Sequence, residues 1–165
     1  MADVKTLPAA WERLRKLPFG RKIFSKLLGR LVPYSATIAP EVLELSPGYA
    51  RVRIRITRGL MNHIQSAHAM ALGNLSELTG GLALSFGMPA GNRLVAAKFT
   101  LEYLKRGYGT LIAECRAPQV DWSLAKQVVE AEVLTRDEHG DVVVRAVGMY
   151  HISAPASRKP QTANG

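Results

Sequence analysis

The chain has 165 residues, of which 47% are hydrophobic, and a formal net charge of +9. This length predicts one domain with a single core, and no apolar run approaches the roughly 20 residues that a membrane-spanning helix needs. The first residues, Met-Ala-Asp-Val-Lys, lack the basic and then apolar order of a secretory signal, so we expect a cytoplasmic protein.

The excess of Lys and Arg favours an anionic partner, and the candidates are nucleic acid, anionic lipid and a phosphorylated cofactor. The alternative is that the charge serves solubility alone. No known motif of a nucleic-acid reader occurs, so we expect no nucleic-acid partner. The single cysteine, Cys115, excludes an internal disulfide and alternates with Leu111 and Ala113 as a small core residue does.

Residues 1–33 form a predicted N-terminal helical extension. Within it, residues 8–32 contain two short amphipathic helices, split at Pro18 and closed near Pro33. Their polar side is almost wholly basic, and their apolar side is formed by Trp11, Leu14, Leu17, Ile23, Phe24, Leu27, Leu28 and Leu31. We expect this apolar side to pack against the domain. The alternatives are a weak contact with an anionic membrane surface and a wall of a fatty-acyl pocket.

Period-two alternation predicts strands before and after a central helix. A first strand over residues 35–45 is interrupted by Pro40, and a second spans 51–56 with Val and Ile on one face and Arg on the other. Four later strands, which we expect to form an antiparallel meander, cover residues 93–105, 109–118, 125–136 and 141–153. Residues 154–165 predict a disordered tail. The fold class is therefore α+β, with an antiparallel sheet wrapped around a long helix.

The central helix is predicted over residues 67–86, and Glu77 is its one acidic residue. The apolar stripe that must face the core contains Ala71, Leu75, Leu78 and Leu82. The neighbouring stripe contains Met70, Asn74, Glu77 and Gly81. Glu77 thus lies at the shoulder of the buried face, a position that lines clefts and subunit interfaces. The alternative is a Glu whose carboxylate reaches water at the edge of a helix–sheet contact.

Asn62, His68 and Glu77 follow a known spacing. An Asn is followed six residues later by a His and nine residues after that by the acid of Leu-Ser-Glu. This pattern resembles the signature of hotdog-fold acyl-CoA thioesterases of the phenylacetyl-CoA and 4-hydroxybenzoyl-CoA type. Segments 101–109 and 128–152 resemble the later strand, basic turn and last hairpin of these enzymes. The Pro-Tyr-Ser-Ala, Asn-His and His-Ala features resemble a subgroup with no assigned function, so no substrate is implied.

The resemblance implies a hotdog domain over residues 34–153 that hydrolyses an acyl-CoA thioester to free acid and coenzyme A. It also implies an active site between the subunits of a homodimer, or of a tetramer built as a dimer of dimers. Along the helix, Glu77 lies roughly 13 Å from the N-terminus. A second subunit is therefore expected to present its helix N-terminus to this carboxylate. Coenzyme A enters as part of the substrate, and we expect no separate cofactor and no metal.

The resemblance also assigns expected roles to individual residues. Glu77 would act as nucleophile or as general base for water, while Asn62 and His68 would hold the loop and the site. The expected substrate and oxyanion positions are Ala69, Met70, Asn74 and Gly81, and the expected coenzyme A phosphate contacts are Lys105 and Arg106. The alternative for Lys105 and Arg106 is a solvated hairpin tip.

Two departures from the family pattern support an alternative. The His-Gly-Gly of the family is His68-Ala69-Met70 here, and the strand after the helix reads Val95-Ala96-Ala97 where some relatives carry a hydroxyl that orients water. The alternative is therefore a non-catalytic hotdog protein that binds an acyl-CoA or a fatty acyl group.

Overall fold

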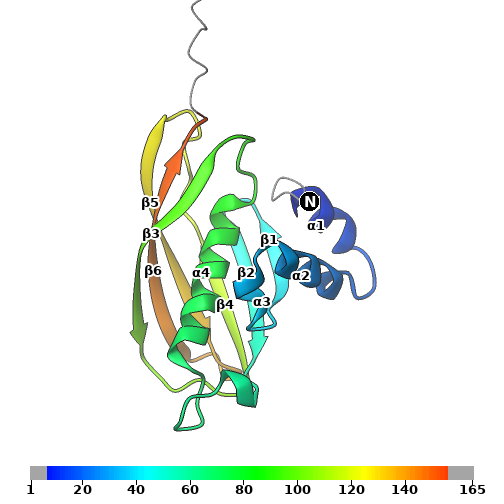
Figure 1. Ribbon diagram of the computed structural model, residues 1–165, viewed down its shortest axis with the longest axis vertical. Coiled ribbons are helices and arrows are strands. Elements are labelled where there is room, and N and C mark those ends of the chain that lie inside the picture. Colours follow the sequence, from blue (N-terminus) through cyan, green and yellow to red (C-terminus); the bar gives the residue numbers. More distant parts are fainter. Residues whose placement is uncertain (1–6, 156–165) are drawn as a thin grey trace, which may run out of the picture.

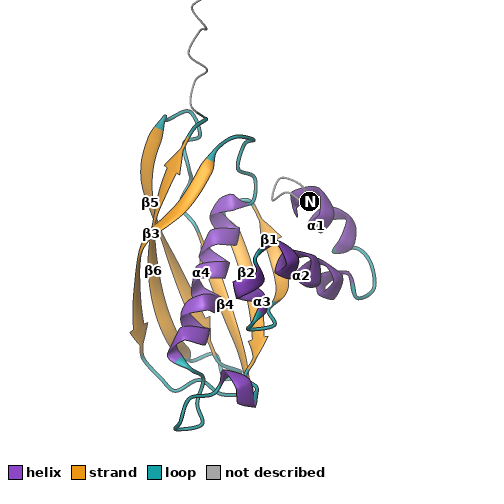
Figure 2. Ribbon diagram, viewed as in Figure 1, coloured by secondary structure: helices purple, strands orange, loops and turns teal. Residues whose placement is uncertain are grey.

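The computed structural model describes residues 7–155 and contains one sheet whose six strands are all antiparallel (Figures 1 and 2). Its helices are α1 (Leu7–Leu14), α2 (Gly20–Leu31), α3 (Pro33–Ala36) and α4 (Ala69–Ser85), with a 3-10 turn at Arg58–Leu60. Its strands are β1 (Glu41–Ser46), β2 (Tyr49–Arg55), β3 (Arg93–Tyr103), β4 (Thr110–Arg116), β5 (Lys126–Arg136) and β6 (Val142–Ser153). Most of the predicted tail, residues 156–165, lies outside the described residues.

The sheet curves around α4, as the predicted architecture requires (Figure 1). The helix is buried on most of its surface because its side chains are apolar nearly all round, and Leu75 is fully buried. On β2, Val52 and Ile54 are buried against it. Arg51 and Arg53, which alternate with them, point outward and pair with acids of β1. Each large apolar side chain buried in this core contributes about 1.5–3 kcal/mol to stability.

The predicted strand over residues 35–45 is wrong in its first half. Residues Pro33–Ala36 form the short helix α3, and only Glu41–Ser46 pairs with β2. Pro33 occupies the first helical position, where its fixed φ favours a helix and its missing N–H costs nothing.

The predicted four-stranded meander is also wrong for β3. The strand order is β1-β2-β4-β5-β6-β3, so β3 pairs with β6, and β4 pairs with β2. Alternation identifies a strand but not its neighbour. Here α4 fills the concave face between β2 and β3, so the chain leaves the helix and rejoins the sheet at its far edge.

The N-terminal helices pack against the domain, as expected. Trp11 and Phe24 are buried and contact each other edge to face, with ring centroids 5.0 Å apart. Ser25 on α2 accepts a hydrogen bond of 2.9 Å from the backbone amide of Val42, so α2 covers the β1 edge of the sheet. Within residues 7–155, none of the helices has the length and apolar character needed to cross a bilayer.

A close approach between α4 and β6 depends on Gly80, and it gives a stability prediction. A Cβ at this position would lie 2.6 Å from the Tyr150 hydroxyl and 3.4 Å from Val133. Gly80→Ala is therefore expected to lower the free energy of unfolding by about 1–3 kcal/mol, even though Ala gains about 1 kcal/mol of helix propensity. Urea unfolding measures the loss.

The Tyr150 hydroxyl provides the matched control. This oxygen is buried and has no hydrogen-bond partner within residues 7–155. Tyr150→Phe should therefore cost no stability, because it removes an unsatisfied polar atom. Combined with Gly80→Ala, it should restore most of the lost stability. A double variant as unstable as Gly80→Ala alone would show that the contact with Tyr150 is not the cause.

Candidate active site

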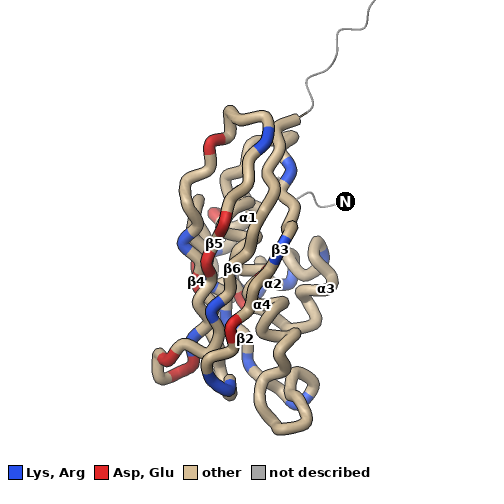
Figure 3. The backbone as a smooth tube through the Cα atoms, turned by 90° about the vertical axis from the view of Figure 1, so that its left-hand side faces the viewer, with Lys and Arg blue, Asp and Glu red and all other residues tan. Residues whose placement is uncertain are grey.

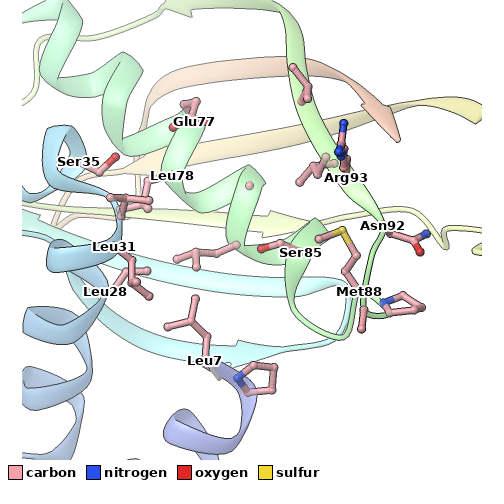
Figure 4. A pocket seen from close by; sticks show the side chains of 18 of the residues that line it. Leu7, Leu28, Leu31, Ser35, Glu77, Leu78, Ser85, Met88, Asn92 and Arg93 are labelled. Carbon is pink, nitrogen blue, oxygen red and sulfur yellow. The ribbon is translucent and has the colours of Figure 1, made fainter. Parts of the chain in front are cut away.

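The main candidate site is an apolar cavity of about 630 Å³ between α4, the N-terminal helices and the start of β3 (Figure 4). Three parts of the chain line it. Helix α4 contributes Glu77, Leu78, Gly81, Leu82 and Ser85. The N-terminal segment contributes Leu7, Pro8, Leu28, Leu31, Val32 and Ser35, and the loop and strand after α4 contribute residues 88–95. Among the described residues, Glu77 and Arg93 are the only charged members of the lining. Glu77 and Leu7 lie at opposite ends of the cavity in Figure 4.

The Glu77 carboxylate is accessible and has no hydrogen bond or ion pair within residues 7–155. Desolvation by the surrounding protein raises its pKa above the ordinary value of 4.5, and no nearby cation opposes that shift. A carboxylate of this kind holds a proton more readily than a fully solvated one. These properties suit a general base. In the same described part of the chain, no three His, Cys, Asp or Glu side chains converge as metal ligands would.

A second depression, of about 340 Å³, lies at the N-terminal end of α4. It brings together four predicted site residues, Asn62, Ala69, Lys105 and Arg106. Asn62 organises the loop before the helix: its side-chain oxygen accepts hydrogen bonds of 3.1 Å from the amides of Ile64 and Ser66, and its amide nitrogen donates to the Ser66 hydroxyl. The structure thus places Asn62 in a positioning role.

His68 is the N-cap of α4, and its Nδ1 accepts a 3.1 Å hydrogen bond from the amide of Met70. The Met70 amide is therefore already occupied. The Ala69 amide makes no hydrogen bond within residues 7–155 and lies at the positive end of the helix, so it is the better oxyanion donor of the two.

Of the two remaining predicted positions on α4, one lines the cavity and the other has a structural contact. Gly81 lines the cavity, and a Cβ there would lie 4.0 Å from a Glu77 carboxylate oxygen. Asn74 is buried and donates to the Tyr34 carbonyl at 3.3 Å, so its amide tethers α3 to α4.

The two predicted coenzyme A contacts differ in their partners. Lys105 lies within 2.7 Å of Asp137 and 2.5 Å of Asp141, which offset its charge. Arg106 is exposed and has no acidic partner among the described residues.

The structure does not bring Glu77 together with Asn62 and His68 within one chain. Ala69 and Glu77 are eight residues apart on one helix, which corresponds to about 12 Å along its axis. The structure also adds Tyr103, a residue that the sequence did not indicate. Its hydroxyl donates to the Ala69 carbonyl at 3.1 Å, beside the second depression. Only its position at the end of a strand, just before the basic turn, could have signalled this contact.

Comparison with known proteins identifies the family. The model of the domain of unknown function DUF4442 matches residues 20–152. The chain belongs to the DUF4442 family. The match starts at the first residue of α2, so the family unit includes the helix that walls the cavity. No curated protein matches this DUF4442 chain.

Solved structures similar to this DUF4442 protein include the structural-genomics protein APC5556, with 32% identity over 89% of this chain and 97% of that one, at a TM-score of 0.76. PA5026 from Pseudomonas aeruginosa, described as a probable thioesterase, has 25% identity over 83% and 96% of the two chains and a TM-score of 0.68.

A mutant of the phenylacetic acid degradation protein PaaI from Thermus thermophilus has 21% identity over 72% of this chain and 97% of that one, at a TM-score of 0.62. The structural neighbours of this DUF4442 protein include proteins described as thioesterases or probable thioesterases, and the hotdog fold expected from the spacing of Asn62, His68 and Glu77 is confirmed.

Proposed function

We propose that this DUF4442 protein is an acyl-CoA thioesterase in which Glu77 activates the attack on the thioester. The observation that carries the proposal is an unpaired carboxylate with a raised pKa at one end of an apolar cavity. The Glu77 side chain is exposed, so water can reach it, while the surrounding protein partly desolvates its charge. An unpaired and partly desolvated charge costs stability, and such a cost is typical of groups retained for chemistry.

The proposed reaction consumes one water molecule. The Glu77 carboxylate takes a proton from water as the water oxygen bonds to the thioester carbon, or attacks that carbon itself to form an anhydride that water then hydrolyses. Negative charge develops on the carbonyl oxygen, where the free amide of Ala69 at a helix N-terminus would stabilise it. In the first route the carbon–sulfur bond of the resulting intermediate then breaks, and the coenzyme A thiolate takes up the proton that Glu77 received from water. In the second route this bond breaks as the anhydride forms, and the thiolate is protonated by the water that later hydrolyses the anhydride.

A homodimer would bring these groups together. The β1 edge of the sheet is covered by α2, whereas β3, 11 residues long, forms the other edge and pairs only with β6 among the described strands. An uncovered strand edge favours pairing with another chain. On this side Met70, Val95, Tyr103 and Leu104 are exposed apolar side chains, as interfaces commonly present.

In the proposed dimer, the β3 strands of two copies pair antiparallel about a two-fold axis, and this arrangement would complete the active site. The Tyr103 end of β3 lies at the start of α4, and its Arg93 end lies at the Glu77 cavity. The two-fold axis would set the helix start of one copy beside the cavity of the other. Sedimentation of the purified protein should therefore give a dimer, or a tetramer built from two dimers, and a monomer under assay conditions would contradict this arrangement.

The cavity suits a straight apolar acyl chain. Its lining is aliphatic apart from Glu77, Arg93, Asn92 and two serines. From Glu77 to Ser85 the helix advances about 12 Å. An extended chain advances about 1.2 Å per bond, so roughly ten carbons would fill this length. For the coenzyme A phosphates, Arg106 is the better of the two predicted contacts, because Asp137 and Asp141 already hold Lys105.

A panel of acyl-CoA substrates with detection of free thiol tests the proposal. We expect the fastest turnover with medium-length straight chains and slower turnover with acetyl-CoA. The absence of turnover across the panel, together with tight binding of the same ligands, would favour the non-catalytic acyl-binding protein.

A further inference from the structure

The outward surface of the N-terminal helices carries most of the net positive charge of the molecule. Residues 7–36 contain seven Lys and Arg and one Glu, so their net charge of +6 is two-thirds of the +9 of the whole chain. All seven basic side chains are exposed. Within residues 7–155, Glu12 pairs with Arg15 at 2.7 Å, and the other six have no acidic partner.

The sheet has a different charge pattern. Acidic and basic residues interleave along β5, β6 and β3 (Figure 3). Arg145 of β6, for example, lies between Glu132 of β5 and Glu102 of β3, at 2.5 and 3.4 Å. The positive charge of the N-terminal helices is therefore not a general property of the surface.

Apolar side chains accompany this charge. At about 100° per residue, Lys22, Lys26 and Arg30 form one stripe along α2, opposite the buried side that carries Phe24 and Leu28. Three large apolar residues are exposed at the N-terminal end of α2: Leu17 and Phe19, which precede the helix, by 55% and 76%, and Ile23, beside the stripe, by 50%. We call this surface, Leu17, Phe19, Lys22, Ile23, Lys26 and Arg30, the basic–apolar face.

Phe19 is also held in an unfavourable backbone conformation. Its φ is 59°, in the left-handed region. This conformation costs a bulky residue roughly 1–2 kcal/mol, and the exposed ring gains no burial in return. An aromatic side chain held in water at such a cost is better explained by a partner that covers it.

We propose that the basic–apolar face docks on an anionic lipid bilayer. The three cations would lie at the level of the lipid phosphates, and Leu17, Phe19 and Ile23 would enter the boundary with the acyl chains, as in interfacial amphipathic helices. A nucleic acid would satisfy the cations, but it offers no apolar environment for Leu17 and Ile23, and aliphatic side chains cannot stack on bases as aromatic ones do. The proposal is independent of the thioesterase activity.

Co-sedimentation of the full-length protein with vesicles tests the proposal. We expect binding to vesicles of phosphatidylcholine mixed with phosphatidylglycerol and little binding to phosphatidylcholine alone. The triple variant K22E/K26E/R30E should bind the anionic vesicles at least about 100-fold more weakly, since each basic residue near such a surface contributes about 1 kcal/mol. The control R55E/R58E/K126E makes the same change in net charge elsewhere and should lose far less.

Phe19→Asn tests the apolar part of the face. Asn tolerates the left-handed conformation, so this variant should melt no lower than the native protein while it binds anionic vesicles about tenfold more weakly. Equal losses in the two charge-reversed triples, no effect of Phe19→Asn, or retention on DNA at moderate salt without vesicle binding would each overturn the proposal.

Discussion

Replacing Glu77 with Gln is expected to lower kcat for acyl-CoA hydrolysis by about 10²–10⁴-fold, the range associated with a positioned general base. Binding of the acyl-CoA should change little, because Gln keeps the size of the side chain in the cavity lining. Free-thiol detection under saturating substrate measures kcat, and titration with a non-hydrolysable acyl-CoA analogue measures binding. Equal turnover in both proteins would exclude Glu77 as the acting group.

The pH dependence offers an independent check on the same residue. The base must be ionised, and desolvation raises the pKa of Glu77 above 4.5. Activity should therefore fall on the acid side at a higher pH than an ordinary glutamate would give. A profile of kcat/KM against pH measures this acid limb, which should be absent from the residual rate of the Glu77→Gln variant.

Stability should respond in the opposite direction to activity. A raised pKa means that the folded state binds the proton of Glu77 more tightly than the unfolded state does, so this group's contribution to stability falls as pH rises through its folded pKa. At neutral pH, Glu77→Gln is then expected to melt above the native protein, and the difference should shrink in acid. Loss of both activity and thermal stability would indicate a structural role instead.

Leu31→Trp is expected to shift the substrate preference toward shorter acyl chains. Leu31 lines the cavity from α2 and is only partly buried, so a larger ring can enter the space that the end of a chain would occupy. If the ring displaces about three methylene groups at about 0.8 kcal/mol each, the ratio of kcat/KM for long over short chains should fall about 50-fold.

Leu31→Met is the matched control, because it nearly conserves volume and should leave the chain-length profile unchanged. Met88→Trp approaches the same cavity from the loop after α4 and should shorten the preferred chain in a similar way. A uniform loss of activity at every chain length, in variants that melt normally, would show that the acyl chain does not lie in this cavity.

Local patterns in the chain were enough to predict most of the elements and the family of the fold. The alternation of β2 and the apolar run around Glu77 depend only on neighbouring residues, and both appear in the structure as expected. Cys115 is buried, as its position in β4 predicted, and burial raises its pKa to about 12. The spacing of Asn62, His68 and Glu77 identified the hotdog fold because it reflects one helix and the loop before it.

Which elements meet could be learned only from the folded chain. Strand alternation does not encode pairing, so the place of β3 beside β6 depends on how the sheet closes around α4. Likewise, the ion pairs of Lys105 with Asp137 and Asp141 join segments more than 30 residues apart, so no local sequence pattern could predict them. The N-terminal helices were recognisable as amphipathic, but their role as a cavity wall required the packed structure, because a cavity is a property of surfaces that converge from distant parts of the chain.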